Sequence, residues 1–206
     1  MLEAVNLTCV RDERVLFETL SFTLQAGDML HVEGANGAGK TSLLRILAGL
    51  SAPEQGAIHW QQQPITHQRA QWHQDLLWLG HQPGIKAVLT AEENVAFYHP
   101  SVGEEAIWRA LEAVDLAGYE TVCVGQLSAG QQRRVALARL WLSQARVWVL
   151  DEPFTAIDKR GVANLMAQME HHCQRGGILV VTTHQDFPAH VANLRKLTLD
   201  AVEPRP

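Results

Sequence analysis

The chain has 206 residues, of which 47% are hydrophobic and 19% charged, with a formal net charge of −5. This length allows one domain with a substantial core, and the acidic balance without a basic stripe argues against nucleic-acid binding. No apolar run approaches the roughly 18 residues of a membrane span, and no secretory signal opens the chain, so we expect membrane contact only through a partner. Three widely spaced cysteines favour reduced thiols in a cytosolic compartment.

The first sixty residues show strand patterns. Residues 2–9 and 20–24 alternate between apolar and polar side chains, and a charged turn at residues 11–14 lies between them. Ala57–Trp60 is a third short candidate. These segments predict a small antiparallel edge of β-structure.

A glycine-rich segment between the second and third of these candidates carries the first motif. It follows the strand-like run Met29–Val32, opens an amphipathic run that ends at Leu50, and reads G-x-x-x-x-G-K-[ST]. Glycines let successive backbone N–H groups turn towards an anion, and the following helix N-terminus favours phosphate. We therefore predict that ATP phosphates contact Gly34, Ala35, Asn36, Gly37, Ala38, Gly39, Lys40, Thr41 and Ser42, with Lys40 on the β- and γ-phosphates and Thr41 on Mg²⁺.

The rest of the chain predicts an α/β fold. The short, almost continuous apolar runs Leu76–Leu79, Val147–Leu150 and Ile178–Thr182 are typical of parallel strands that are buried on both faces. Helical patterns at residues 92–98 and 104–116 lie between the first two runs. We expect one domain over residues 1–206, with a helical subdomain at about residues 84–145 inserted into a mostly parallel core.

Two carboxylates follow the second of these runs directly. Acidic side chains at the carboxyl end of a buried strand lie where open α/β sheets bind ligands. Asp151 is predicted to complete the Mg²⁺ site, and Glu152 to act as the general base that polarises the attacking water.

The segment Leu127–Gln132 reads L-S-x-G-Q before a basic helix. Ser128 and Gln131 fit a helix capping box, yet the motif also stands 23 residues before Asp151. In this combination the chain resembles the ATP-binding cassette (ABC) family over essentially its whole length, which implies a P-loop ABC ATPase core with an antiparallel β edge and a helical subdomain.

The resemblance implies further site residues. Gln82 matches the glutamine that senses Mg²⁺ and the attacking water, Asp158 the loop that crosses a dimer interface, and His184 the histidine that contacts the γ-phosphate. The adenine-stacking position, usually aromatic in the family, falls at about Arg11, whose planar guanidinium can stack on a base. Phe17 is the alternative, although core packing suits it better.

The resemblance also implies a head-to-tail dimer of two copies. Ser128, Gly130 and Gln131 of one copy would face the γ-phosphate bound at Lys40 of the other. ATP and Mg²⁺ are then the cofactors, and ATP joins the two copies until hydrolysis releases them.

A narrower resemblance rests on Leu79–Lys86, Ala129–Leu142 and Asp151–Asp158. These segments are similar to the ATPase subunits of the cytochrome c maturation system, the CcmA family. The resemblance implies a peripheral place on the cytoplasmic face of a bacterial inner membrane, a CcmB-type membrane subunit, other cytochrome c maturation proteins as partners, and haem export or release of a haem chaperone.

Two alternatives remain at this point. The cassette could energise an importer or exporter of another small molecule, because nothing in a cassette contacts the cargo. It could also be a soluble ABC ATPase of DNA repair or translation, although the coiled-coil insertion and the second cassette of those types are absent.

Overall fold

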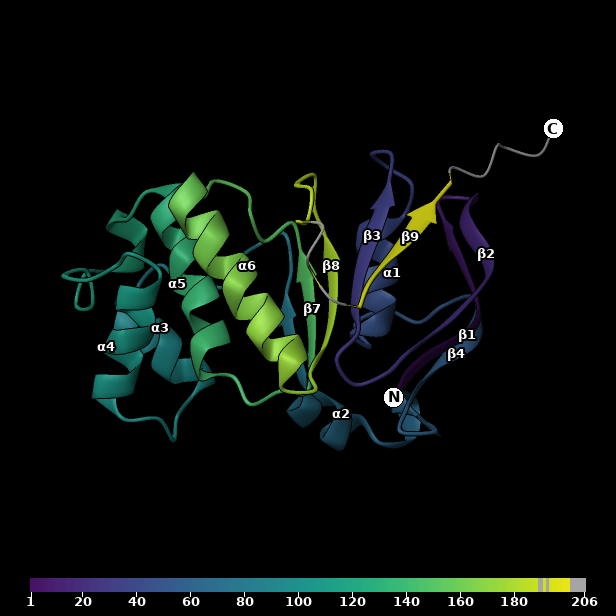
Figure 1. Cartoon of the computed structure of the whole chain (residues 1–206), viewed down its shortest axis with the longest axis horizontal. Helices are drawn as coiled ribbons and strands as arrows, with labels where there is room; N and C mark the ends of the chain where they lie inside the picture. Colours follow the sequence, from purple (N-terminus) through teal and green to yellow (C-terminus); the bar gives the residue numbers. More distant parts are fainter. Residues whose placement is uncertain (189–190, 192, 201–206) are drawn as a thin grey trace. The chain divides into compact units, whose positions relative to one another are not determined.

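The computed structural model describes residues 1–188, 191 and 193–200, and it contains two compact units. The first unit comprises residues 1–78, 145–152 and the described residues from 172 onward. The second comprises residues 79–144 and 153–171. Figure 1 follows the helices and strands of both units in chain order.

The first unit contains an antiparallel sheet with the strand order β2-β1-β4-β5. The turn between its first two strands has φ angles of 49° at Asp12 and 62° at Glu13, the left-handed values that suit a two-residue hairpin. The predicted antiparallel segments are confirmed, and β2 begins several residues earlier than expected. The strands are β1 (Leu2–Arg11), β2 (Arg14–Leu24), β4 (Gln55–Trp60) and β5 (Gln63–Pro64).

The same unit contains the five-stranded sheet of order β6-β7-β8-β3-β9. The pairs β3–β8, β3–β9 and β7–β8 are parallel, and every residue of β7 and β8 is buried, as expected for strands covered on both faces. The three predicted apolar strands are confirmed. The strands are β3 (Met29–Gly34), β6 (Leu76–Leu79), β7 (Val147–Asp151), β8 (Ile178–Thr182) and β9 (Leu194–Leu199).

The hydrophobic core of the first unit joins both sheets to helix α1 (Lys40–Leu47). Leu43, Leu44 and Leu47 of this helix are fully buried, which is the apolar stripe expected of an amphipathic helix. The short helices η1 (Ile65–His67) and α2 (Arg69–Asp75) complete the unit.

The second unit is helical. Helix α3 (Ala91–Tyr98) begins with a capping box between Thr90 and Glu93, and it packs against α4 (Glu104–Ala113) and α5 (Ala129–Leu142). A short η2 (Val124–Gln126) precedes α5, and α6 (Lys159–Gln174) starts in this unit.

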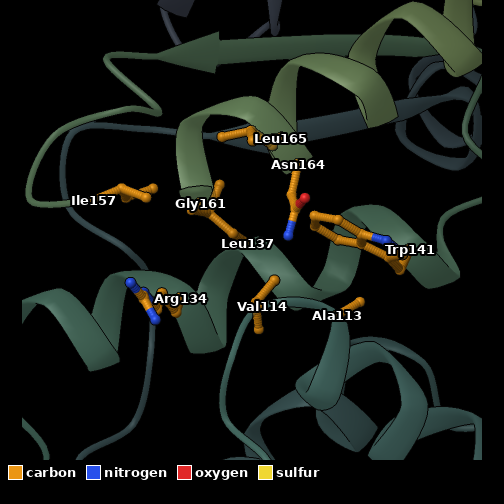
Figure 2. A pocket seen from close by; sticks show the side chains of 9 residues that line it. All are labelled: Ala113, Val114, Arg134, Leu137, Trp141, Ile157, Gly161, Asn164 and Leu165. Atoms are coloured by element: carbon orange, nitrogen blue, oxygen red, sulfur yellow. The ribbon is translucent and has the colours of Figure 1, made fainter. Parts of the chain in front are cut away.

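Side chains from α4, α5 and α6 surround a small cavity of about 10 Å³, which is room for one water molecule (Figure 2). In that view Trp141 and Leu137 of α5 face Asn164 and Leu165 of α6. This packing fixes the start of α6 against α5 within the helical unit.

The longest described helix, α6, has 16 residues. None of the helices in the described part of the chain is both long and apolar enough to span a bilayer.

His99, which directly follows α3, gives the fold a pH dependence. Burial, followed by the positive charge of Arg139, lowers the pKa of His99 below its ordinary 6.5. Its Nε2 has no hydrogen-bond partner in the described residues. In the unfolded chain His99 binds a proton below pH 6.5, whereas the folded state resists protonation. The free energy of unfolding should therefore fall as the pH drops below 6.5.

The variant His99→Gln tests this contribution. We expect its free energy of unfolding to fall less than that of the unmutated chain between about pH 7.5 and 5.5 in urea titrations. The same pH slope in both proteins would show that His99 is not the responsible group.

Candidate nucleotide-binding site

The phosphate loop lies where the motif predicts it, between β3 and α1. Gly34 has a φ of 145°, and a side chain there would come within 2.5 Å of the Leu199 carbonyl oxygen, so only glycine fits. Lys40 turns back over the loop and donates hydrogen bonds from Nζ to the carbonyl oxygens of Gly34 (2.6 Å) and Ala35 (3.1 Å). The ammonium group thus lies at the loop whose N–H groups are predicted to bind phosphate.

The predicted metal ligands Thr41 and Asp151 are in direct contact. Thr41 Oγ1 donates to Asp151 Oδ2 at 2.8 Å, across 110 residues of sequence. Thr182 Oγ1 donates to Asp151 Oδ1 at 2.6 Å, and Asp151 is only 2% exposed. Two hydroxyl groups therefore orient a buried carboxylate at the carboxyl ends of β7 and β8.

The predicted base and the predicted histidine also lie together. Glu152 Oε1 is 3.5 Å from His184 Nε2. Glu152 has a φ of 49°, and its backbone N–H donates to both the carbonyl oxygen and Oγ1 of Thr182. This uncommon backbone conformation is held by hydrogen bonds at the end of a buried strand, which is typical of a functional position.

The signature motif lies at the start of α5 in the helical unit. Ser128 is the N-cap, its Oγ accepts from the Gln131 backbone N–H, and the Gln131 side chain accepts from the Ser128 N–H in return. A side chain at Gly130 would come within 2.9 Å of the Ala156 carbonyl oxygen. Gly130 thus permits close packing of the motif on the segment that leads to Asp158.

Asp158 caps helix α6. Its Oδ1 accepts from the Gly161 backbone N–H at 3.0 Å and from Arg134 Nη2 at 2.9 Å. Arg134 also lies 3.6 Å from Asp115 Oδ2. Figure 2 shows Arg134 on α5 beside the segment that carries Ile157 and Gly161. The predicted interface aspartate is therefore attached to the signature helix of its own chain.

Gln82 and Arg11 complete the set of predicted residues. Gln82 is exposed in the helical unit, next to His81, whose carbonyl oxygen accepts from the buried Arg133 at 3.3 Å. Arg11 ends β1 and donates to Ser51 Oγ at 3.4 Å, so its stacking on adenine stays a prediction. Phe17, the alternative, is buried in the core.

The sequence profile of the ABC transporter family matches residues 17–155. The cytochrome c biogenesis ATP-binding export protein CcmA of Tatumella citrea is 60% identical over 98% of this chain and 97% of its own length. The chain belongs to this family of ABC cassettes. The proteins of the same name from Yersinia pestis and Salmonella typhi are 58% and 56% identical, over 97% of this chain and 93% and 97% of their lengths.

Solved structures confirm the cassette fold. A putative ABC transporter ATP-binding protein from Pyrococcus furiosus has a TM-score of 0.81 and 26% identity, with 96% of both chains covered. A dimeric bacterial ABC transporter cassette also has a TM-score of 0.81, at 22% identity over 98% of this chain and 96% of that chain.

Several polar residues of the cassette were not predicted from the sequence. Thr182 was assigned only to a strand, Arg133 and Arg134 only to a basic helix, and His31 only to the strand before the phosphate loop. Each acts through a partner more than 20 residues away, so no local motif marks it. A polar side chain within an apolar strand, as at His31 and Thr182, is the one available signal.

Arg134 offers a test of the Asp158 segment in the cassette. Arg134→Met should lower ATP turnover severalfold, because the segment loses its attachment, while the free energy of unfolding changes by less than about 1 kcal/mol for this partly exposed ion pair. Arg160→Met is the matched control, since that side chain is 78% exposed and lies 3.8 Å from Asp115. Equal turnover in the two variants would contradict the role of Arg134.

Proposed function

We propose that this chain is the ATPase subunit of a membrane-bound export complex in cytochrome c biogenesis. The observation that carries the proposal is full-length similarity, at 56–60% identity, to proteins named as cytochrome c biogenesis ATP-binding export proteins. The contacts among Thr41, Asp151, Glu152 and His184 support ATP hydrolysis as the activity.

Mg²⁺ fits the residues at the phosphate loop. Magnesium is usually held by one or two carboxylates together with substrate phosphates, and Thr41 and Asp151 offer oxygen ligands in contact with each other. In residues 1–188, 191 and 193–200, no group of three or more His, Cys, Asp or Glu side chains is placed to bind a metal by itself. Bound Mg²⁺ would neutralise phosphate charge, with Thr41 and Asp151 as its protein-side neighbours.

Different residues of the first unit carry out different parts of ATP hydrolysis. Loop N–H groups and Lys40 bind the phosphates, which positions the γ-phosphate for in-line attack. Glu152 accepts the proton of the attacking water, and His184, whose Nε2 faces Glu152 Oε1, contacts the γ-phosphate. Hydrogen-bond donors that are held in place where negative charge develops would further stabilise the transition state.

A second copy of the chain completes each site. Ser128 and Gly130 at the N-terminus of α5 would approach the γ-phosphate bound by the other copy, where the helix dipole favours negative charge. Asp158 lies on the segment that packs on Gly130 and would cross the same interface. The dimer would close around ATP and open after hydrolysis, and this movement is its mechanical output.

A CcmB-type membrane subunit and other cytochrome c maturation proteins would receive that output at the cytoplasmic face of the bacterial inner membrane. The direct test is co-purification of the tagged chain from membranes in mild detergent, with and without ATP. We expect a small polytopic membrane protein together with cytochrome c maturation factors. Recovery of an unrelated permease would overturn the cytochrome c role while leaving the ATPase assignment in place.

A further inference from the structure

His31 is a buried polar residue that the mechanism above does not use. On β3, Leu30 and Val32 point into the hydrophobic core, so His31 lies on the opposite face of the sheet with Met29 and Glu33. The histidine is 3% exposed. Its strand lies between β8 and β9, as Figure 1 shows.

The ring of His31 contacts the segment that carries His184. Its Nε2 lies 3.1 Å from the carbonyl oxygen of Thr183, and because a carbonyl only accepts hydrogen bonds, Nε2 must donate. Phe187 packs against the ring edge-on, with the ring centroids 5.3 Å apart. Thr183, directly before His184, and Phe187, three residues after it, thus both contact the imidazole.

The other side of the ring faces a charged pair. His31 Nδ1 lies 3.2 Å from Glu33 Oε1, and Lys196 Nζ donates to the same oxygen at 2.6 Å. The hydrogen bond from Lys196 lowers the pKa of Glu33, so the carboxylate stays ionised beside the ring. Lys196 is also the register partner of His31 on β9. Nδ1 itself has no hydrogen-bond partner among the described residues, so the orientation of the ring rests on the bond from Nε2 to the Thr183 carbonyl oxygen.

The Thr183 peptide links the contacts of His31 to the residues with proposed roles in ATP hydrolysis. Thr182, one residue earlier, is fixed by its hydrogen bonds to Asp151 and Glu152. The Thr183 hydroxyl accepts from the Gln185 N–H at 2.9 Å. The His184 side chain itself is 71% exposed, so its direction towards Glu152 depends on how the backbone presents it.

We propose that His31 is a positioning residue for ATP hydrolysis, which holds the Thr183 carbonyl and so directs His184 towards the γ-phosphate of ATP. The inference rests on the role of His184 in the proposed function. His31 touches no reacting atom, and it acts through one hydrogen bond.

Three substitutions of His31 separate this hydrogen bond from packing. In His31→Gln the side-chain amide nitrogen can take the place of Nε2, in His31→Asn the amide reaches only as far as Nδ1, and His31→Leu fills space without a donor. We expect kcat to fall roughly tenfold in the Asn and Leu variants of the full chain, and the Gln variant to keep at least about half of it. ATP affinity and KM should change by less than about twofold, because the phosphate loop is untouched.

His59→Leu, at a half-buried histidine of β4, is the matched control and should turn over ATP normally. Melting temperatures of all variants separate turnover from stability. A Gln variant as slow as the Leu variant, or losses of kcat that simply follow the melting temperatures, would overturn the inference.

The double variant His31→Leu with His184→Ala gives the decisive comparison. If His31 acts through His184, the Leu substitution should cost less than about twofold in a chain that already lacks His184. A full tenfold loss in that background would show that His31 acts elsewhere. If His184→Ala alone turned over normally, the proposed role of His184 would fail, and the inference about His31 would fall with it.

Discussion

Glu152→Gln should retain ATP binding while ATP turnover falls by about 10²–10⁴-fold, the usual contribution of a general base. Glutamine has nearly the same shape and keeps an oxygen that accepts hydrogen bonds, but it takes no proton from water at neutral pH. The backbone N–H of Glu152 bonds to Thr182, so the substitution leaves the strand end in place. The carboxylate lies 3.5 Å from His184 Nε2, and in the proposed mechanism it takes the proton of the attacking water.

The measurement compares steady-state ATP hydrolysis with binding of a fluorescent ATP analogue in the purified chain. Glu54→Gln, at an exposed carboxylate of the first unit, controls for the loss of a negative charge. Normal turnover in Glu152→Gln would remove Glu152 from its role as the base.

Lys40→Ala should act one step earlier, on nucleotide binding itself. The Lys40 ammonium donates hydrogen bonds to the loop carbonyl oxygens of Gly34 and Ala35, at the position where the β- and γ-phosphates are expected. A hydrogen bond to a charged group contributes about 1.5–3 kcal/mol to binding, so its loss should weaken ATP affinity by roughly 10- to 100-fold.

Titration of the same ATP analogue measures this effect, and Arg69→Ala removes an exposed positive charge of the same unit as a control. Both variants should melt near the temperature of the unmutated chain. Unchanged ATP affinity in Lys40→Ala would contradict the assignment of the phosphate loop.

Local patterns explain why much of the fold could be predicted from sequence. The apolar runs at Val147–Leu150 and Ile178–Thr182 form buried parallel strands, because only such strands need a nearly continuous apolar sequence. The phosphate loop has a fixed spacing between a strand and a helix, so its position followed from one motif.

Other features depend on tertiary contacts that sequence alone does not display. Strand β9 carries Arg195 and Lys196 and lies at the edge of the parallel sheet, where charged side chains face solvent and hide the strand pattern. The helix cap formed by Asp158 was missed because its sequence was interpreted only as an interface loop.

The residues of the candidate site, too, could be predicted from the sequence only in part. Asp151 and Glu152 were predicted because they directly follow an apolar strand, and in the structure Thr41 bonds to the first and His184 lies 3.5 Å from the second. The hydrogen bond between Glu33 and Lys196 beside His31 joins β3 to β9 across 163 residues of sequence, so no spacing rule could have revealed it.

We propose that two copies of this chain complete each ATP site head to tail. The most direct test mixes two inactive variants, Lys40→Ala and Gly130→Asp, and measures ATP hydrolysis. In a mixed dimer one site combines an intact Lys40 with an intact signature motif, so activity should return to about a quarter of the unmutated level. A mixture that forms dimers and stays inactive would contradict the shared site.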